Sequence, residues 1–371
     1  MNNFRLFIEL AALAVVFAGL PLSYVWMKRE YGFFEKLNWL LVFMTFDLII
    51  FGAFTRLTDS GLGCPDWPGC YGTSNPWHAL GDIQLAQAAF PTGPVSVMKA
   101  WIEMVHRYLA MTVGTLIVVQ LLIAWSKVKV LGKSPFLGSV GLLLLVCIQG
   151  AFGAWTVTLK LQPIIVSTHL LLALMLLACL TAYANQSCFQ PSSSHLSSSH
   201  RLLPRMLVTL AIVVLSIQIF LGAWVSTNYA VLACPDFPTC LGTFWPQMEW
   251  QEGFTFWRKL GLTAQGEYIS PLALQTIHWT HRVFAILTVL VLVVLFAVSW
   301  RVWTSGLPQL KNLSRLLGAL IALQILTGVS NVVFQWPLLA ALMHTGGAAA
   351  LVFCLVRMMH WSSWKSSIPL R

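Results

Sequence analysis

Nine apolar runs, each about 20 residues long, set the strongest limit on how this chain can fold. A helix of about 20 residues crosses the hydrocarbon core of a bilayer. The chain is 58% hydrophobic and only 9% charged, which leaves too few polar residues to cover a water-soluble globule of 371 residues. The sequence therefore predicts an all-α polytopic membrane protein embedded in the lipid bilayer. The runs lie near 5–27, 38–55, 101–125, 137–158, 163–184, 206–227, 273–300, 316–336 and 338–359.

The basic residues indicate membrane orientation and not a nucleic-acid partner. The net charge is +10, but Lys and Arg form no stripe or basic domain and fall mostly in short gaps between apolar runs. Such cationic gaps stay on the cytoplasmic side of a bacterial-type inner membrane. Nine crossings then place the N-terminus outside and the C-terminus in the cytoplasm, with the long gaps 56–100 and 228–272 on the outer side. The cytoplasmic gaps are 28–37, 126–136, 185–205, 301–315 and the tail from 360.

The first apolar run, near 5–27, has a second interpretation as a signal peptide, because it combines a cationic start with an apolar core. The run is long, carries Glu9 and lacks a clear small-residue cleavage site. Lys28 and Arg29 follow it at once. These features favour a retained transmembrane helix.

An internal repeat organises the rest of the chain. Residues 38–184 and 206–359 are predicted to be two copies of one four-helix unit. Because each copy has an even number of crossings, we expect the copies to be parallel, related by a pseudo-twofold axis along the membrane normal. Gly52, Cys64 and Cys70 recur 170 positions later as Gly222, Cys234 and Cys240. His106, Arg107, Gln149, Gly153 and His169 recur 175 positions later as His281, Arg282, Gln324, Gly328 and His344.

Three further segments flank the repeats. Residues 1–37 form an extra N-terminal helix with its cytoplasmic loop, and residues 360–371 form a cytoplasmic tail. Residues 185–205 join the copies, and their Ser content predicts a flexible linker. We interpret His195 and His200 as linker residues, because the tract offers no third metal ligand.

Four histidines occupy matching places in the repeats, near the outer ends of the second and fourth helices. A single His in a membrane helix is often a packing residue, but four at repeated positions are hard to explain by packing. Facing helices of a bundle hold haem with one imidazole on each side of the iron. The pattern predicts two haem sites, with the iron bound by His106 and His169 in one and by His281 and His344 in the other.

Charged residues beside these histidines differ between the copies. Arg107 and Arg282 suit haem propionates by charge-assisted contact, although they could instead snorkel to the headgroups. One helical turn before the first His lies Glu103, where the second copy has His278. A carboxylate in a low-dielectric bundle is costly, so Glu103 is a candidate for proton handling or charge positioning. The alternative is an i,i+4 pair with Arg107 at the water boundary.

Two pairs of cysteines lie in the predicted outer loops. Cys64 and Cys70, like Cys234 and Cys240, are separated by five residues that include two prolines. An oxidising compartment and a bent chain favour a disulfide in each pair. The sequence does not settle whether these disulfides are structural or redox-active. Three cysteines lie within apolar runs and are interpreted as small apolar residues: Cys147, Cys179 and Cys354.

These residues together resemble one known family. Residues 52–68, GAFTRLTDSGLGCPDWP, resemble the opening signature of haem A synthases, and residues 103–107, EMVHR, look like their Glu-x-x-His-Arg helix. The resemblance covers roughly residues 38–359. It departs from the family in the extra leading helix and in His278, which leaves open whether His278 or His281 binds iron.

The resemblance implies an enzyme that oxidises the ring methyl of haem O to the formyl group of haem A, for cytochrome oxidase. It implies a substrate site at His106, His169 and Glu103, and a resident haem b at His281 and His344. Haem O, an unidentified electron donor, haem O synthase and cytochrome oxidase assembly factors are the expected partners. Two imidazoles close an iron to oxygen, so either one His dissociates during turnover or no oxygen binds at that iron. A b-type haem electron carrier or quinol oxidoreductase, and a haem transporter, are alternatives.

Overall fold

The computed structural model describes residues 32–187, 199–303 and 308–363, together with positions 9, 19 and 23. The predicted helix near 5–27 and the linker residue His195 therefore lie outside the described residues, and His200 is described only in its backbone.

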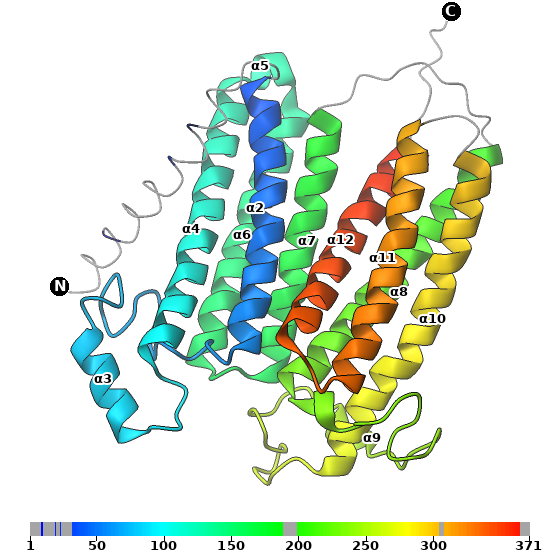
Figure 1. Ribbon diagram of the computed structural model, residues 1–371. Helices are drawn as coiled ribbons and strands as arrows, with labels where there is room; N and C mark the ends of the chain where they lie inside the picture. Colours follow the sequence, from blue (N-terminus) through cyan, green and yellow to red (C-terminus); the bar gives the residue numbers. More distant parts are fainter. Residues whose placement is uncertain are drawn as a thin grey trace, which may run out of the picture. The chain divides into compact units, whose positions relative to one another are not determined.

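The described residues contain eight helices that are long and apolar enough to cross a membrane (Figure 1). They match the eight later runs of the sequence, so the prediction of an all-α multi-pass membrane protein is confirmed. Shorter helices are α3 (Leu80–Ala89), α5 (Val128–Leu131), α9 (Trp250–Gly253) and the 3-10 helix η1 (Ala230–Leu232). The eight long helices are α2 (Phe33–Leu57), α4 (Val97–Ser126), α6 (Lys133–Thr158), α7 (Pro163–Ser187), α8 (Ser199–Thr227), α10 (Pro271–Trp303), α11 (Pro308–Val333) and α12 (Leu338–Ser363).

Several helices extend beyond the apolar runs that predicted them. Helix α4 begins at Val97, four residues before the run, because Ser96 caps its first turn. The Ser96 hydroxyl oxygen accepts a hydrogen bond from the Lys99 amide at 3.2 Å. A polar cap sets where a helix starts, whereas an apolar window only marks the part that lipid can surround.

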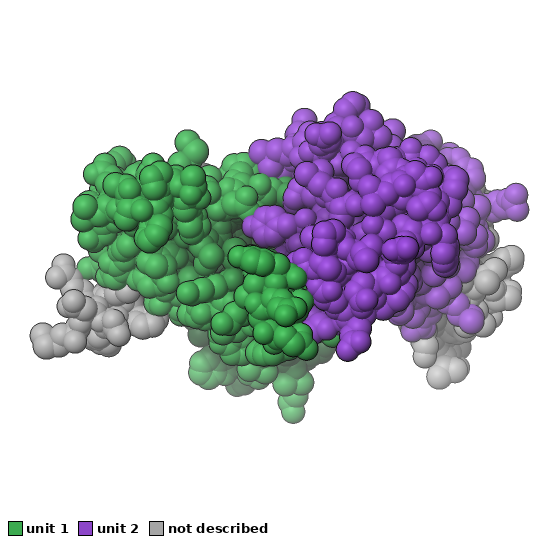
Figure 2. Space-filling model, turned by 90° about the horizontal axis from the view of Figure 1, so that it is seen from below, with its two compact units in different colours: residues 1–184, 256–268 green, residues 185–255, 269–371 purple. Residues whose placement is uncertain are grey.

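The chain divides into two compact units, coloured separately in Figure 2. The first comprises residues 1–184 with 256–268, and the second comprises 185–255 with 269–371. The parallel arrangement of the copies stays a prediction.

The first unit is a bundle of α2, α4, α6 and α7 (Figure 1). At the end away from the long loop 58–96, buried polar contacts join these helices. Gln120 of α4 donates to the Asn38 side-chain oxygen of α2 at 2.7 Å. Tyr183 of α7 lies 2.9 Å from the Ser139 hydroxyl of α6, and its ring meets Phe34 of α2 at 6.2 Å between centroids. Each helix is thus fixed to its neighbours in register.

The second unit repeats this architecture with α8, α10, α11 and α12, in which α8 packs on α10 and α12, and α11 packs on α10 and α12. Ser314 of α11 donates to the Ser299 hydroxyl of α10 at 3.1 Å. Both units therefore have a closed ring of four helices with polar ties in an otherwise apolar core.

Backbone conformation repeats as closely as sequence does. The turn between α6 and α7 uses positive φ angles of 50° and 56° at Lys160 and Leu161, and the turn between α11 and α12 uses 54° and 65° at Gln335 and Trp336. These residues are 175 positions apart, like the histidines. The internal repeat is therefore present in the turns as well as in the helices.

Candidate functional site

The long loop 58–96 is folded around a disulfide. Cys64 and Cys70 are bonded with their Cα atoms 4.9 Å apart, as predicted. Between them, the carboxylate of Asp66 accepts hydrogen bonds from the amides of Tyr71 and Gly72, both at 2.7 Å. Asp is favoured at such turns because its side chain can pair with backbone amides a few residues on. The second loop has the same construction, with Cys234 bonded to Cys240 and Asp236 in the place of Asp66.

The first loop lies directly on helix α4. A Cβ atom at Gly63 would come within 2.5 Å of the Lys99 backbone, so only glycine allows this approach. Beneath the loop, the disulfide packs with Ala100 and Met104 in a buried apolar cluster. The loop is therefore held at a fixed height above the segment that carries His106.

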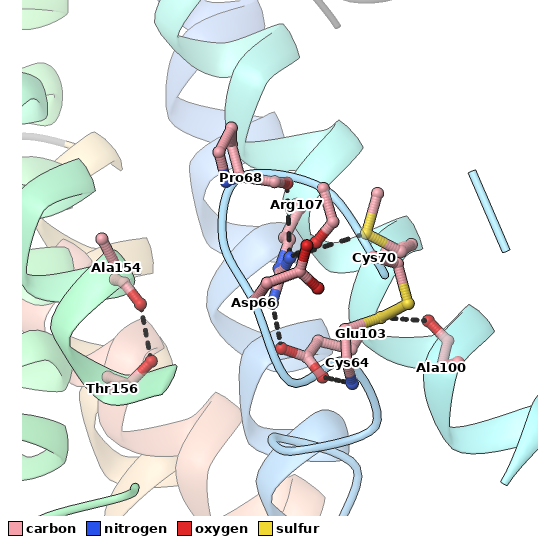
Figure 3. A network of polar contacts seen from close by, with 12 residues as sticks. Cys64, Asp66, Pro68, Cys70, Ala100, Glu103, Arg107, Ala154 and Thr156 are labelled. Atoms are coloured by element: carbon pink, nitrogen blue, oxygen red, sulfur yellow. Dashed lines mark hydrogen bonds and ion pairs between the residues drawn. A yellow bond between two sulfur atoms is a disulfide. The ribbon is translucent and has the colours of Figure 1, made fainter. Parts of the chain in front are cut away.

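Glu103 and Arg107 tie the loop to α4 from below (Figure 3). The two side chains form an ion pair at 2.5 Å and are only 4% and 8% exposed. The other carboxylate oxygen of Glu103 accepts from the Cys64 amide at 2.8 Å. Arg107 also donates to the carbonyls of Pro68, at 3.3 Å, and Gly69. Both ends of the disulfide turn are thus held by one buried ion pair.

The second unit has the same tie with a different partner. Arg282 donates to the carbonyls of Asp236 at 2.7 Å, Thr239 at 3.0 Å and Cys234 at 2.5 Å. In place of a carboxylate, the His278 Nε2 accepts from the Arg282 Nε at 3.1 Å. The arginine therefore keeps its loop-holding role in both units, while the residue one turn earlier changes from acid to imidazole.

These contacts bear on the alternatives left open for Glu103 and the two arginines. Glu103 does pair with Arg107 at i,i+4, as the alternative held, and the pair is buried within the chain. Burial arises because the loop and its disulfide cover this end of α4. Arg107 and Arg282 point into loop carbonyls here, and their contact with haem propionates stays a prediction.

Each predicted ligand histidine of the first unit lies against a glycine on the neighbouring helix. His106 Nε2 would be 3.0 Å from a Cβ at Gly52 of α2, and His169 would be 3.2 Å from one at Gly153 of α6. The ring of Phe51 stacks on His106 with centroids 6.4 Å apart. The two imidazoles are near enough to interact electrostatically. Glycine makes room for an imidazole between helices that any other residue would fill.

The second unit places its histidines in the same way. His281 would be 2.9 Å from a Cβ at Gly222 of α8, and His344 would be 3.3 Å from one at Gly328 of α11. His281 and His344 also lie within electrostatic range of each other. His281 thus faces the bundle interior from α10, while His278 is engaged with Arg282. This placement favours His281 over His278 as the iron ligand.

Backbone ties orient the fourth helix of each unit. Gln149 donates to the His169 carbonyl at 3.0 Å, and Gln324 donates to the His344 carbonyl at 3.0 Å. These glutamines recur in the sequence repeat, but sequence reasoning gave them no role. Their contacts fix the helix segment that presents each imidazole.

The imidazole nitrogens themselves have different neighbours in the two units. In the second unit, Gln218 Nε2 lies 3.1 Å from His281 Nδ1, and Thr327 Oγ1 lies 2.9 Å from His344 Nδ1. The corresponding residues of the first unit are Leu48 and Phe152. Sequence reasoning missed Gln218 and Thr327 because they do not recur. Their only signal is that each lies within one helical turn of a recurring glycine.

The donor set fits haem better than a bare metal ion. Within the described ranges, no cluster of three or more His, Cys, Asp or Glu side chains could hold a metal ion. Each unit instead offers two imidazoles from facing helices, lodged against glycines in an apolar bundle. Such a pair suits the two axial positions of a haem iron, whose other four ligands come from the porphyrin.

Comparisons with known proteins identify the family of the chain. A family model described as cytochrome oxidase assembly protein matches residues 35–356. A haem A synthase of Shewanella oneidensis is 38% identical over 91% of this chain and 99% of its own length. Haem A synthases of Rickettsia bellii and Mesorhizobium japonicum are 27% and 28% identical, covering 86% and 90% of this chain and 96% and 91% of their own lengths. The chain therefore belongs to the cytochrome oxidase assembly protein family, together with these haem A synthases.

Proposed function

We propose that this chain is a haem A synthase, which oxidises the ring methyl of haem O to a formyl group. The observation that carries the proposal is the buried carboxylate of Glu103, one turn before His106, in a unit whose copy has His278 instead. A pure electron carrier or a transporter needs no such asymmetry. The family and the relatives support the same reaction.

The two units divide the work. His106 and His169 hold the substrate haem O in the first unit, and His281 and His344 hold a haem b in the second. The haem b held in the second unit would supply one-electron transfer. The glycines give the imidazoles their places between the helices, and the apolar helices keep water from the reacting methyl group.

Glu103 acts on the proton or charge that the oxidation releases. It lies on the same face of α4 as His106, one helical turn away. Its Oε2 accepts from the Cys64 amide and its Oε1 pairs with Arg107. These donors hold the carboxylate in one orientation under the outer loop, where a proton can leave toward the aqueous side.

The membrane placement and partners belong to the same proposal. The chain lies in the bacterial-type inner membrane with its C-terminus in the cytoplasm, which puts both disulfide loops in the oxidising compartment. It receives haem O from haem O synthase. It also exchanges electrons with a redox partner that has yet to be identified. Its product passes to the assembly factors of cytochrome oxidase.

The test must separate the charge of Glu103 from its structural ties. Both carboxylate oxygens of Glu103 accept hydrogen bonds. In Glu103→Gln one of these oxygens is replaced by an NH2 group, which cannot accept, so one of the two hydrogen bonds is lost. Glu103→His is the better variant, because His278 already shows how an imidazole accepts from the following arginine. We expect Glu103→His to keep the disulfide and the bound haem but to stop conversion at haem O or at an alcohol-level product.

The readout is chromatography of haems extracted from cells and from the purified protein. Haem A at the wild-type level in both Glu103 variants would show that no carboxylate is required at this position. Loss of the disulfide in Glu103→His would mean that the loop tie had not been preserved, and Glu103→Gln would then be compared at equal disulfide content.

A further inference from the structure

The second unit differs from the first in the polar contacts at Nδ1 of its ligand imidazoles. We propose that Thr327 and Gln218 are positioning residues that fix His344 and His281 with Nδ1 protonated and Nε2 turned to the haem iron, so that this haem is retained. The first unit lacks both groups, which makes its haem site exchangeable. The inference rests on the proposed function, in which one haem stays and the other is substrate.

Thr327 meets His344 with a hydroxyl that already has a backbone partner. Its hydroxyl donates its single proton to the Leu323 carbonyl at 2.7 Å. The same oxygen lies 2.9 Å from His344 Nδ1 and therefore accepts a hydrogen bond from it. A neutral imidazole with its proton on Nδ1 has its lone pair on Nε2. The helix α11 backbone thus sets the tautomer that iron ligation requires.

Gln218 contacts His281 through its side-chain amide, which can either donate or accept a hydrogen bond. Its Nε2 lies 3.1 Å from His281 Nδ1 and donates to the His281 carbonyl at 3.3 Å. Among the residues that the structure describes, its Oε1 is buried and has no hydrogen-bond partner. A half-turn of the amide, whose two ends are nearly identical in shape, lets Oε1 accept from Nδ1–H. The orphaned oxygen gains a partner when His281 binds iron, at the loss of the long carbonyl contact.

The first unit shows what the absence of these groups means. Leu48 and Phe152, the counterparts of Gln218 and Thr327, carry no hydrogen-bonding group. The Nδ1 of His169 is buried and has no partner within the described residues. An imidazole without such a contact is a weaker ligand with a less defined orientation, because outer hydrogen bonds raise ligand basicity and fix the ring. That property suits a site whose occupant must enter as haem O and leave as haem A.

The experiment uses Thr327→Val in the full purified chain, because valine keeps the shape and removes the acceptor. Two quantities are measured: the rate of haem transfer to excess apomyoglobin, and the midpoint potential of the low-spin haem. Loss of an outer contact lowers metal-site affinity by roughly 10–100-fold, so we expect transfer at least about 10-fold faster. We expect the potential to rise, because a less basic imidazole stabilises ferric iron less. Thr327→Ser should restore both values.

Thr288→Val is the matched control. Thr288 is also buried in the second unit and donates to a backbone carbonyl one turn earlier, that of Phe284 at 3.0 Å, but no contact with a ligand histidine is seen. Equal changes in both valine variants, or wild-type retention and potential in Thr327→Val, would overturn the inference. Loss of haem in His344→Ala with an unchanged Thr327→Val would overturn it while leaving the proposed function intact. No retained haem in the wild type would instead defeat the proposed division of the units.

Discussion

The loop-bearing ends of the two units are built alike but differ in their polar contacts. In both, an arginine on the second helix holds a disulfide loop by its carbonyls. In the first unit its helical partner is the carboxylate of Glu103, and the Nδ1 of His169 has no hydrogen-bond partner in the described part of the chain. In the second unit the partner is His278, and both ligand imidazoles have contacts behind them. The scaffold thus keeps its loop-holding arginines and varies the partners of these arginines and of the ligand imidazoles.

Under the proposed function, this difference separates the tasks of the two units. A reaction needs an ionisable group and an occupant that can leave, and the first unit supplies both conditions. An electron relay needs a haem that stays, and the second unit supplies the contacts for it. Neither feature alters the helix ring, because each changes a side chain whose backbone position is the same in both units.

Loss of a ligand gives the largest expected effect. His344→Ala removes one axial ligand of the retained haem, so we expect the purified protein to lose its low-spin spectrum while still inserting into the membrane. His169→Ala, the matched change in the first unit, should keep the retained haem and lose conversion of haem O. An unaltered spectrum in His344→Ala would contradict the assignment of the second pair.

Crowding an imidazole should have a smaller effect of the same kind. In Gly222→Ala, the new methyl group lies 2.9 Å from His281, so the ring must shift from its place against α8. We expect a displaced spectrum and partial loss of the retained haem. Gly52→Ala places a methyl group 3.0 Å from His106 and should reduce only haem O conversion. Optical spectra with haem chromatography distinguish the two variants. Identical spectra for both would contradict the claim that the two units hold different haems.

The disulfides should matter differently in the two units. Cross-linking a loop this short contributes roughly 2–3 kcal/mol by chain entropy, so either loop should become more sensitive to protease when its bond is lost. Cys64→Ser should in addition lower haem A formation, because the Cys64 amide donates to Glu103. Cys234→Ser should not. In the wild type, thiol reagents should label these cysteines only after reduction, and labelling without reductant would refute the bonds.

The smallest expected effect is on the stability of the second disulfide loop at acidic pH. Hydrogen bonds from Thr239 and from the Gly242 and Leu241 amides lower the pKa of the Asp236 carboxyl from its ordinary 3.8 to about 2. A lowered pKa in the folded loop means that the ionised carboxylate stabilises it above pH 3.8, and this contribution is lost as pH falls toward 2. Asp236→Asn should remove that acid dependence. Amide hydrogen exchange at Leu241 across this range is the measurement, and an equal dependence in the variant would exclude Asp236 as its source.

Much of this architecture follows from the sequence. The apolar runs predicted all eight described membrane helices, and repeated residues predicted two four-helix copies, because apolar length and periodic identity are properties of sequence alone. The cysteine pairs were found from their spacing and the compartment of their loops. The family prediction is confirmed by the comparisons.

The contacts around the site could not be predicted in the same way. That Glu103 is buried depends on the loop covering α4, and the loop can approach only because Gly63 has no side chain. That Thr327 faces His344 depends on how α11 and α12 are rotated against each other, which a repeat pattern does not report. The sequence predicted which residues matter and left the partner of each to the fold.

The disulfide turn has a constant spacing from its preceding helix. From Gly52 to Gly72 every counterpart lies 170 positions later, and the five-residue difference between the copies arises only beyond this stretch. The bonded cysteines, the aspartate and the left-handed residues Tyr71 and Leu241 therefore form a module of fixed length. Such a module can be exchanged as one piece, so chimaeric chains carrying two first-unit turns or two second-unit turns are accessible without redesigning a helix.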